Sequence, residues 1–483
     1  LLWEKYGETH GCHVGDCLHI MHPLAIFWWR VFWGQLERIG KDNVRVVTGP
    51  AGSGKTTWIK NMLRDTKIEP DRVFPCAPTG VACENLRRAL TEFSTDLSNR
   101  VDTPHTRFEM ADKQHKQDGI PEWVNDWIPK RSGKDKESLY ILDEAPNADL
   151  RTVALMLLKV RTRGQLILVG DPNQLAPVGW GEPIRVLLES GWVKPENDIR
   201  LTKVWRVEDG YQGLSNAADS IINGMFPSTG GYGFSVRTAE NFADLEDTVV
   251  GLMRSGYQVL TATNPMARYF GQQYSAWKFQ QGGGKGNGER AMFMNKGDLV
   301  RVVSKGASRK QGIFNGSLGF LQSFSPVHGY LKINPCYGPL HDSSQGFKVY
   351  FDKEKTEAFK LKSKNIEDRY DELRALGLED DDFDQWMENT MADACDGYLM
   401  HANSITIHRA QGSEWERVVV VVPGSCRLLN RELFYVACTR AKIDCIVIFM
   451  NDKTLGAGPM EVAKTRLMRP ADRKPYKIFL NKP

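Results

Sequence analysis

The chain has little of what marks secreted and membrane proteins. Its nine cysteines among 483 residues are scattered and odd in number, which argues against a disulfide framework and for a reducing compartment. No apolar run reaches the roughly 18 residues that a membrane span needs, and no secretory signal is evident. We therefore expect a soluble intracellular protein, in the cytoplasm or nucleoid or in a nucleus.

A large net charge is also absent. The formal value is +4 at pH 7, which is compatible with nucleic acid binding but does not argue for it. The charge is unevenly placed, because residues 367–396 hold twelve Asp or Glu and two Arg. We expect this acidic segment to be a solvated helix. The alternative is a surface that docks a protein partner or mimics DNA.

The N-terminal segment, residues 1–42, is unusual in composition. Six potential metal ligands fall within thirteen positions: His10, Cys12, His13, Cys17, His19 and His22. Their spacing fits no common zinc pattern, so we favour a strand or loop with incidental His and Cys over a zinc site. The aromatic cluster from Phe27 to Trp33 is expected to pack against the domain that follows. Because the chain begins with Leu1 and not Met, we expect residues upstream of it in the full protein.

The chain length suggests roughly three or four domains. Residues 43–205 alternate short apolar strands with helical stretches, which predicts a parallel α/β domain. A polar insertion at about 94–137 interrupts it. A second α/β domain is expected over 206–310 and 396–450, followed by a tail at 451–483. Between its two parts, over 311–395, short strands joined by Gly- and Ser-containing turns predict a small inserted β-barrel ahead of the acidic segment.

The stretch GPAGSGKTT predicts a nucleotide site. Glycines at 49 and 54, followed by Lys55 and Thr56, form the pattern G-x-x-x-x-G-K-T, whose backbone N–H groups cradle phosphates. An apolar strand precedes it and a helix follows, so the phosphates would meet a helix N-terminus. Lys55 should reach the β- and γ-phosphates, and the Thr56 hydroxyl should bind Mg²⁺. A chance glycine-rich turn is the disfavoured alternative.

Acidic and polar residues follow two further strands. Asp143 and Glu144 end the run LYILDEA, where Asp143 can hold Mg²⁺ and Glu144 can polarise the attacking water. Asp171 and Gln174 follow LILVG, and a Gln at a strand tip beside the γ-phosphate can sense its loss. The alternative for this second group is an ordinary polar turn.

Two arginines lie beyond the first α/β domain. Arg206 ends LTKVWR, and Arg440 lies in LFYVACTRAK. Arginines accelerate hydrolysis by neutralising transition-state charge. If both reach the nucleotide, ATP lies between two domains, and hydrolysis opens and closes the cleft as in a motor. A surface ion pair is the plainer alternative for either residue alone.

This ordered set of motifs resembles the superfamily 1 helicases over roughly residues 43–450, and most of all their RecD-like, 5′-to-3′ branch. The motifs are GPAGSGKTT, APTGVA, LDEA, GDPNQLAPV, LTKVWR, TIHRAQGSEW and LFYVACTRAK. The resemblance implies two RecA-like motor domains that use ATP and Mg²⁺. It also implies a strand-separating pin at the first insertion and an SH3-like barrel at the second.

The resemblance assigns roles by position. Nucleotide contacts fall on Gly49, Gly52, Ser53, Gly54, Lys55, Thr56, Thr57, Gly412 and Glu414, the last at the ribose. Metal ligands are Thr56 and Asp143. Catalytic residues are Lys55, Asp143, Glu144, Gln174, Arg206 and Arg440, of which Gln174 and the two arginines contact the γ-phosphate. Pro78, Thr79, His105, Thr106, Thr263, Asn264, Thr406 and His408 would line a single-strand channel.

The chain departs from this branch in one respect. The branch carries a Gln upstream of the phosphate loop that reads adenine, and here Gln35 is only a weak candidate, so adenine specificity is open. We expect an ATP-dependent helicase or translocase that moves 5′-to-3′ on single-stranded DNA and opens duplexes and forks. The alternatives are a viral-replicase-type RNA helicase, a DNA-stimulated ATPase subunit without unwinding of its own, and a binding module with a degenerate ATPase. The last is disfavoured because the full set of catalytic residues is present.

Overall fold

The protein is described from a computed structural model. The described residues are 23–108, 137–160, 164–177, 179, 181–205, 212–229, 232–281, 297–303, 316–325, 330–335, 347–350, 398–422, 430–450, 464 and 467–468. They belong to two compact units, Leu1–Arg206 with Pro470–Pro483 and Val207–Arg469, and each unit is described by itself. The N-terminal Cys/His cluster, the acidic segment 367–396 and Arg206 lie outside the described residues. Within the described part, no helix is long and apolar enough to cross a membrane.

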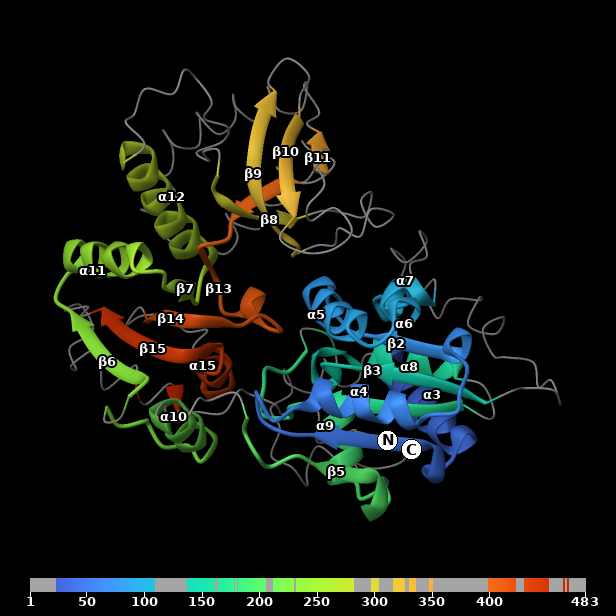
Figure 1. The fold of residues 1–483 in the computed structure, drawn as a ribbon. Coiled ribbons are helices and arrows are strands. Elements are labelled where there is room, and N and C mark those ends of the chain that lie inside the picture. Colours follow the sequence, from blue (N-terminus) through green and yellow to red (C-terminus); the bar gives the residue numbers. More distant parts are fainter. Residues whose placement is uncertain are drawn as a thin grey trace. The chain divides into compact units, whose positions relative to one another are not determined.

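Unit 1 is built on a parallel five-stranded sheet with the order β2-β3-β4-β1-β5 (Figure 1). Its strands are β1 (Val44–Thr48), β2 (Val73–Cys76), β3 (Ser138–Leu142), β4 (Gly164–Gly170) and β5 (Asp198–Arg200). Successive side chains of a strand point to opposite faces of the sheet, and here each face is buried in its own hydrophobic cluster. On β1, Val46 joins one core cluster and Val47 the other.

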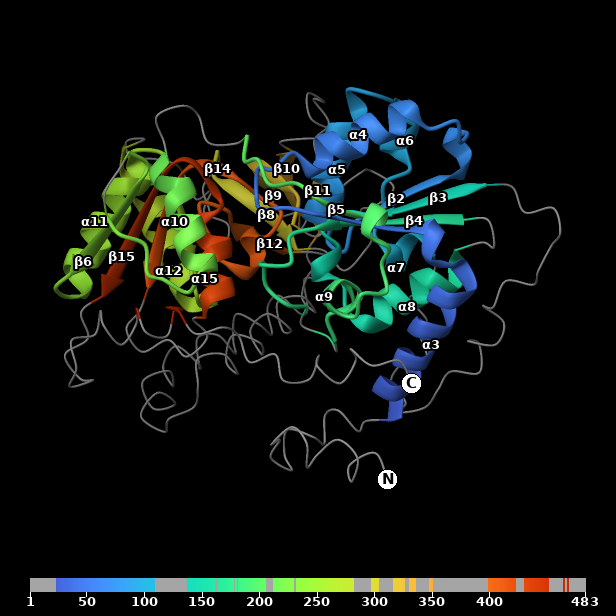
Figure 2. The same ribbon diagram turned by 90° about the horizontal axis from the view of Figure 1, so that it is seen from below.

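Helices cover both faces of this sheet. On one face lie α3 (Pro23–Ile39), α8 (Leu150–Lys159) and α9 (Pro183–Glu189), and on the other α4 (Lys55–Asp65), α5 (Gly80–Thr91) and α6 (Thr95–Asn99). Figure 2 shows α3 beside α8, with which it packs. The short connecting elements are η1 (Lys41–Asn43), η2 (Pro70–Arg72), α7 (Pro104–Arg107), η4 (Ala145–Asn147) and η5 (Pro195–Asn197).

Two boundaries of unit 1 differ from expectation. Trp28, Phe32 and Trp33 of α3 are buried in the same core as β1 and α8, so the first domain extends upstream of residue 43, where we expected it to begin. The polar insertion was expected from about residue 94. Residues 94–108 instead carry α6 and α7, and both Leu97 of α6 and Val101, between the two helices, pack into the core. The remainder, 109–136, lies outside the described residues.

Unit 2 contains a second parallel sheet, in the order β13-β7-β14-β15-β6. Its strands are β6 (Phe234–Ala239), β7 (Gln258–Thr261), β13 (Ser404–Thr406), β14 (Trp415–Val422) and β15 (Ala441–Met450). Its helices are α10 (Gln212–Ile222), α11 (Phe242–Arg254), α12 (Asn264–Gln281), η7 (His408–Ala410) and α15 (Arg431–Cys438). The expectation of two parallel α/β domains is confirmed.

An antiparallel sheet is inserted in unit 2 between α12 and β13. Its order is β11-β10-β9-β8-β12 (Figure 1), from β8 (Leu299–Val303), β9 (Leu318–Ser325), β10 (Tyr330–Pro335), β11 (Phe347–Tyr350) and β12 (Tyr398–His401). The insertion of short strands is therefore present, and it extends beyond the range 311–395 that we expected. Because β12 ends at His401 and β13 begins at Ser404, the inserted sheet leads directly into the parallel one.

Candidate nucleotide and nucleic-acid sites

The phosphate loop, residues 49–54, connects the carboxyl end of β1 to α4. Gly52 and Gly54 have φ of 80° and 85°, a backbone region that residues with a side chain rarely adopt. A Cβ on Gly49 would lie 2.4 Å from Ser53 Oγ and 2.7 Å from the Leu201 carbonyl oxygen, so only glycine fits there. Gly54 begins α4 without a side-chain cap, which leaves the first N–H groups of the helix for an anion.

Two polar side chains of this loop are buried. The Lys55 ammonium donates to the carbonyl oxygens of Gly49 at 2.8 Å and Pro50 at 2.9 Å, and is therefore held over the loop. The Ser53 hydroxyl has no hydrogen-bond partner among the described residues. Thr56 is half-buried and Thr57 exposed at the start of α4. An acceptor-rich ligand such as a polyphosphate would satisfy these donors.

The acidic pair lies two strands away, at the carboxyl end of β3. Asp143 is buried, and its carboxylate accepts from the Glu144 N–H at 2.9 Å. Burial, and then repulsion from Glu144, raises the pKa of Asp143 to about 7, while that hydrogen bond and the Lys55 ammonium act in the opposite direction. Lys55 and Asp143, 88 positions apart in the sequence, are thus brought together, and a divalent cation would relieve the cost of the buried carboxylate.

Glu144 adopts an unusual backbone conformation. Its φ is 50° and its ψ is 35°, in the left-handed region, and it is the one residue of the described part other than glycine with a positive φ. Such a conformation costs energy and persists where the surrounding structure imposes it. Here it turns the chain from β3 into η4, just after the metal-ligand candidate Asp143.

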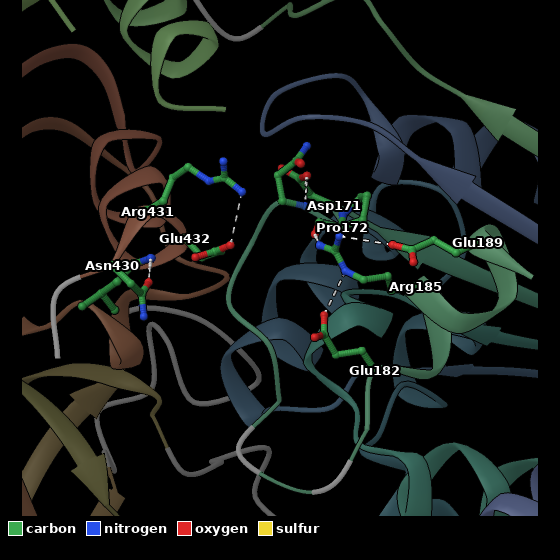
Figure 3. A network of polar contacts seen from close by, with 10 residues as sticks. Asp171, Pro172, Glu182, Arg185, Glu189, Asn430, Arg431 and Glu432 are labelled. Atoms are coloured by element: carbon green, nitrogen blue, oxygen red, sulfur yellow. Dashed lines mark hydrogen bonds and ion pairs between the residues drawn. The ribbon is translucent and has the colours of Figure 1, made fainter. Parts of the chain in front are cut away.

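The loop after β4 carries Asp171 and Gln174, both buried. Asp171 closes a local turn by accepting from the Asn173 N–H at 3.0 Å. Arg185 of α9 holds the loop from outside, since its guanidinium donates to the Pro172 carbonyl at 2.5 Å (Figure 3). The same guanidinium lies 3.1 Å from Glu182 and 3.6 Å from Glu189. Sequence analysis missed Arg185, because nothing in its local pattern distinguishes it from an ordinary helical arginine.

A second residue that sequence analysis missed is Trp205. Its main-chain N–H donates to the Gly52 carbonyl at 2.8 Å, and its ring lies near Gly54. The indole is 67% exposed, although a Trp normally buries most of its surface. The Lys203 ammonium lies 3.5 Å from the ring centroid. The sequence feature that could have indicated Trp205 is its position in LTKVWR, directly before Arg206.

The structure gathers the nucleic-acid candidates of unit 1 at one place. Pro78 and Thr79 follow β2, and the segment that leads to His105 and Thr106 runs beside that strand end. The Ala77 N–H donates to the Asp102 carbonyl, and the Asp102 N–H donates to the Pro75 carbonyl. Thr79 and His105 are exposed. The Thr79 hydroxyl also caps α5 by accepting from the Ala82 N–H at 3.2 Å. It therefore has a structural role whether or not it contacts a strand.

The candidates of unit 2 also meet at a sheet edge. Thr263 and Asn264 follow β7, while Thr406 ends β13, which pairs with β7 in register Thr406 to Thr261. The Thr406 side chain is buried, and its hydroxyl accepts from the Arg409 N–H at 3.4 Å. The Asn264 side-chain oxygen is buried without a partner within the described residues. His408, in contrast, is exposed and open to a ligand.

The remaining candidates of unit 2 lie near the start of β14. The Arg440 guanidinium is buried and donates to the Val436 carbonyl at 2.9 Å and the Ser413 carbonyl at 3.1 Å. Glu414, next to Gly412 and Ser413, pairs with Lys442 at 2.6 Å. Beyond them, Asn430 caps α15, and Arg431 lies 3.7 Å from Glu432 (Figure 3). Arg440, between α15 and β15, is thus bonded to the loop that carries Gly412 and Glu414.

Gln35, the weak adenine candidate, is engaged elsewhere. Its side-chain oxygen accepts from Arg38 Nε at 2.5 Å. Arg38 in turn donates to the carbonyls of Leu157 and Val160 at the end of α8. That end of α8 precedes β4, so it lies at the amino edge of the sheet, opposite the phosphate loop. No group of three or more metal-ligating side chains occurs in the part of the chain that the structure describes.

Comparison with protein families matches two segments of the chain. Residues 36–232 match the family described as an AAA domain, and residues 401–448 match the UvrD-like helicase C-terminal domain. The chain is 23% identical over 416 residues to the ATP-dependent RecD2 DNA helicase of Deinococcus radiodurans, covering 84% of this chain and 47% of that protein. These matches confirm the resemblance of the motifs to the RecD-like branch of the superfamily 1 helicases.

The chain is also similar to a second curated protein and to a solved structure. It is 24% identical over 486 residues to an uncharacterized protein of Methanocaldococcus jannaschii, covering 84% of this chain and 37% of that one. The crystal structure of Bacteroides Pif1 bound to ssDNA aligns with a TM-score of 0.45 and 15% identity, over 86% of this chain and 91% of that one. The chain spans less than half the length of the Methanocaldococcus jannaschii and Deinococcus radiodurans proteins.

Proposed function

We propose that the chain is an ATP-dependent motor that moves 5′-to-3′ on single-stranded DNA and unwinds duplex and forked DNA. Support comes from its family and from the names of its relatives, among them an ATP-dependent DNA helicase. The observation that carries the proposal is one hydrogen bond in unit 1. The Asp143 N–H donates to the Cys76 carbonyl at 2.9 Å, so the acidic pair is tied to the strand that leads into Pro78 and Thr79.

That bond places Asp143, the candidate Mg²⁺ ligand, close to Pro78 and Thr79, the candidate contacts to single-stranded DNA. A structural change at the nucleotide then reaches the DNA-binding segment over a short distance, because rigid, hydrogen-bonded strands carry coupling between two sites. The exposed His105 beside it offers a ring on which a base can stack.

In this proposal each residue of the nucleotide site has a defined task. The phosphate loop and Lys55 bind the phosphates, while Thr56 and Asp143 hold Mg²⁺, which neutralises charge on the phosphate oxygens. Glu144 accepts a proton from the attacking water, and Gln174 registers the presence of the γ-phosphate. Arg206 and Arg440 neutralise the charge that develops during hydrolysis. The indole of Trp205 stacks on the nucleobase, the part that Gln35 is not placed to read.

The strand contacts and the insertion complete the proposal. Hydroxyls and backbone N–H groups at Thr79, Thr106, Thr263 and Thr406 bind DNA phosphates without reading sequence, and Asn264 and His408 extend this surface. The inserted antiparallel sheet is the SH3-like barrel of the branch. A pin in the segment 109–136, and partner contacts through the acidic segment or the N-terminal segment, fall outside the described residues.

The test is unwinding of matched duplexes that carry either a 5′ or a 3′ single-stranded DNA tail, with Lys55→Ala as the inactive variant. We expect unwinding from the 5′ tail only, and none by the variant. Unwinding from the 3′ tail would overturn the polarity. Intact DNA-stimulated ATPase without unwinding would indicate a translocase or a subunit that needs a partner. Activity on RNA tails alone would indicate the replicase-type function.

A further inference from the structure

The inserted sheet is attached to the η7 loop, residues 406–411, by two arginine contacts that run in opposite directions. Arg301 of β8 donates from Nη1 to the Arg409 carbonyl at 3.2 Å. Arg409 donates from its own guanidinium to the Met400 sulfur on β12. One contact reaches from the sheet to the loop and the other from the loop to the sheet.

The two sheet residues are themselves neighbours. Arg301 and Met400 face each other in the antiparallel register of β8 and β12, so the three residues form one closed group around a single cross-strand pair. Arg301 is 3% exposed. Burying a guanidinium to this degree costs free energy unless its charge is paired and its N–H groups are hydrogen-bonded. We therefore expect Arg301 to have a specific structural or functional role.

The base of the inserted sheet is packed tightly at this point. Directly before β8, the buried Asp298 accepts from Ser275 of α12 at 2.5 Å and lies 3.6 Å from Lys278. Gly271 of α12 leaves no room for a side chain, since a Cβ there would lie 2.7 Å from the His401 Cβ. The sheet therefore meets α12 and the η7 loop as a rigid body, and Figure 1 shows α12 beside it.

The η7 loop is where a rigid attachment matters. Within it, the Arg409 N–H donates to the Thr406 hydroxyl at 3.4 Å, and the exposed His408 lies between these two residues. A shift of the Arg409 main chain therefore moves Thr406 and His408, the two residues of this loop that we expect to contact single-stranded DNA. We propose that Arg301 and Met400 are positioning residues, through which the inserted sheet fixes the η7 loop in the geometry that couples strand binding to ATP hydrolysis. The inference rests on the proposed function.

The test compares three variants of the full chain. Arg301→Lys keeps the charge but cannot reproduce the reach and fork of the guanidinium, and Met400→Leu keeps the volume but removes the sulfur acceptor. Ile333→Val on β10 is the matched control. It removes one buried methyl group from the same sheet, and β9 and β8 separate its strand from β12. ATPase is measured with and without oligo-dT, together with oligo-dT affinity and the melting temperature.

We expect Arg301→Lys to lower the DNA-stimulated kcat roughly fivefold or more, the scale of a typical coupling between sites. Its basal ATPase and its KM for ATP should stay close to wild type, as should all values of the Ile333→Val control. Met400→Leu should shift in the same direction by less, because a thioether is a weak acceptor. Amide exchange of residues 404–411 should be faster in both variants, while that of β14 and β15 should not change.

Three outcomes would overturn this inference and leave the proposed function intact. They are unchanged DNA stimulation in both variants, an equal loss in Ile333→Val, and a loss of basal and stimulated rates in parallel with the melting temperature. If the wild-type chain shows no DNA stimulation of its ATPase, the proposed function itself fails. If Arg301→Lys does not fold, Met400→Leu decides, since its near-isosteric change leaves every buried charge in place.

Discussion

The main-chain N–H of Trp205 donates to the carbonyl oxygen of Gly52 at 2.8 Å. This bond fastens the end of LTKVWR to the phosphate loop, although the two are far apart in the sequence. The largely exposed indole lies beside the start of α4, and the Lys203 ammonium lies over one face of the indole ring. An aromatic ring held there by its backbone is well suited to contact a bound nucleotide.

Replacing Trp205 by Ala should weaken ATP binding while the phosphate loop stays intact, because the bond to Gly52 uses only the main chain. An aromatic stacking contact contributes about 0.5–1.5 kcal/mol, which corresponds to roughly two- to tenfold in Kd. The measurement is nucleotide affinity by fluorescence titration, with tripolyphosphate as a ligand that has no base. Trp205→Phe should retain most of the affinity. An equal loss for tripolyphosphate would mean that the loop itself had been disturbed.

Glu144→Gln should abolish turnover and leave nucleotide affinity nearly unchanged, because the amide cannot accept the proton of the attacking water. General-base catalysis is worth about 10²- to 10⁴-fold in rate. The control is Asp149→Asn, the same carboxylate-to-amide change nearby. Asp149 caps α8 by accepting from the Thr152 N–H at 2.8 Å, a role that Asn fills equally well. Steady-state ATPase with ADP binding tests this, and a Glu144→Gln enzyme that still hydrolyses ATP at the wild-type rate would contradict it.

Arg185→Gln should lower kcat with little change in the KM for ATP, because it releases the Pro172 carbonyl and loosens the loop that carries Gln174. A displacement of about 1 Å at a catalytic group can cost up to roughly 100-fold in rate. Arg200→Gln removes another arginine ion pair of unit 1, the exposed one with Asp198, and should have no effect on rate. If kcat is unchanged while the melting temperature falls, the role of Arg185 is limited to stability.

Two glycine substitutions in unit 1 should have opposite effects on the free energy of unfolding. Gly49→Ala would force its Cβ against Ser53 Oγ and the Leu201 carbonyl, and such overpacking costs about 1–3 kcal/mol. Gly34 lies exposed within α3, and a Cβ added there would meet no atom within 4 Å. Gly34→Ala should therefore stabilise the protein by about 0.5–1 kcal/mol, the usual gain in a helix.

Urea denaturation with nucleotide titration separates these two cases. Gly49→Ala should lose nucleotide binding as well as stability, while Gly34→Ala should bind nucleotide as wild type does. A Gly49→Ala protein that is as stable as wild type and binds ATP normally would show that the phosphate loop adapts to the extra atom.

The nucleotide-site residues could be predicted from the sequence because they follow apolar strands. Parallel strands end at a common sheet edge, so Gly49, Asp143 and Gln174 were expected to converge whatever the order of the strands. The resemblance alone assigned Thr263 and Thr406, and the structure shows that the strands before them, β7 and β13, are paired. Strand and helix periodicity likewise predicted both parallel sheets and the inserted short strands, since these patterns depend on local burial alone.

Other features depended on contacts that local pattern does not encode. The aromatic cluster of α3 packs against the following domain as expected, but only the structure shows that it forms part of that domain's core. Nothing local to Arg185, Trp205 or Arg301 indicates its partner. Trp205 bonds the distant Gly52 carbonyl, and Arg301 bonds the Arg409 carbonyl 108 positions away. Such pairs exist only once strand order and helix packing have brought the carbonyls within reach.

The sequence by itself determined the two parallel sheets, the residues of the phosphate loop and acidic pair, and the resemblance to the superfamily 1 helicases, because each follows from short patterns of residue type. Only the tertiary structure decided that β1 lies between β4 and β5, that Trp205 is fastened to the phosphate loop, and that Arg301 and Met400 hold the η7 loop. The physical reason is that a hydrogen bond requires its donor and acceptor within about 3 Å, and for distant residues that distance is set by packing.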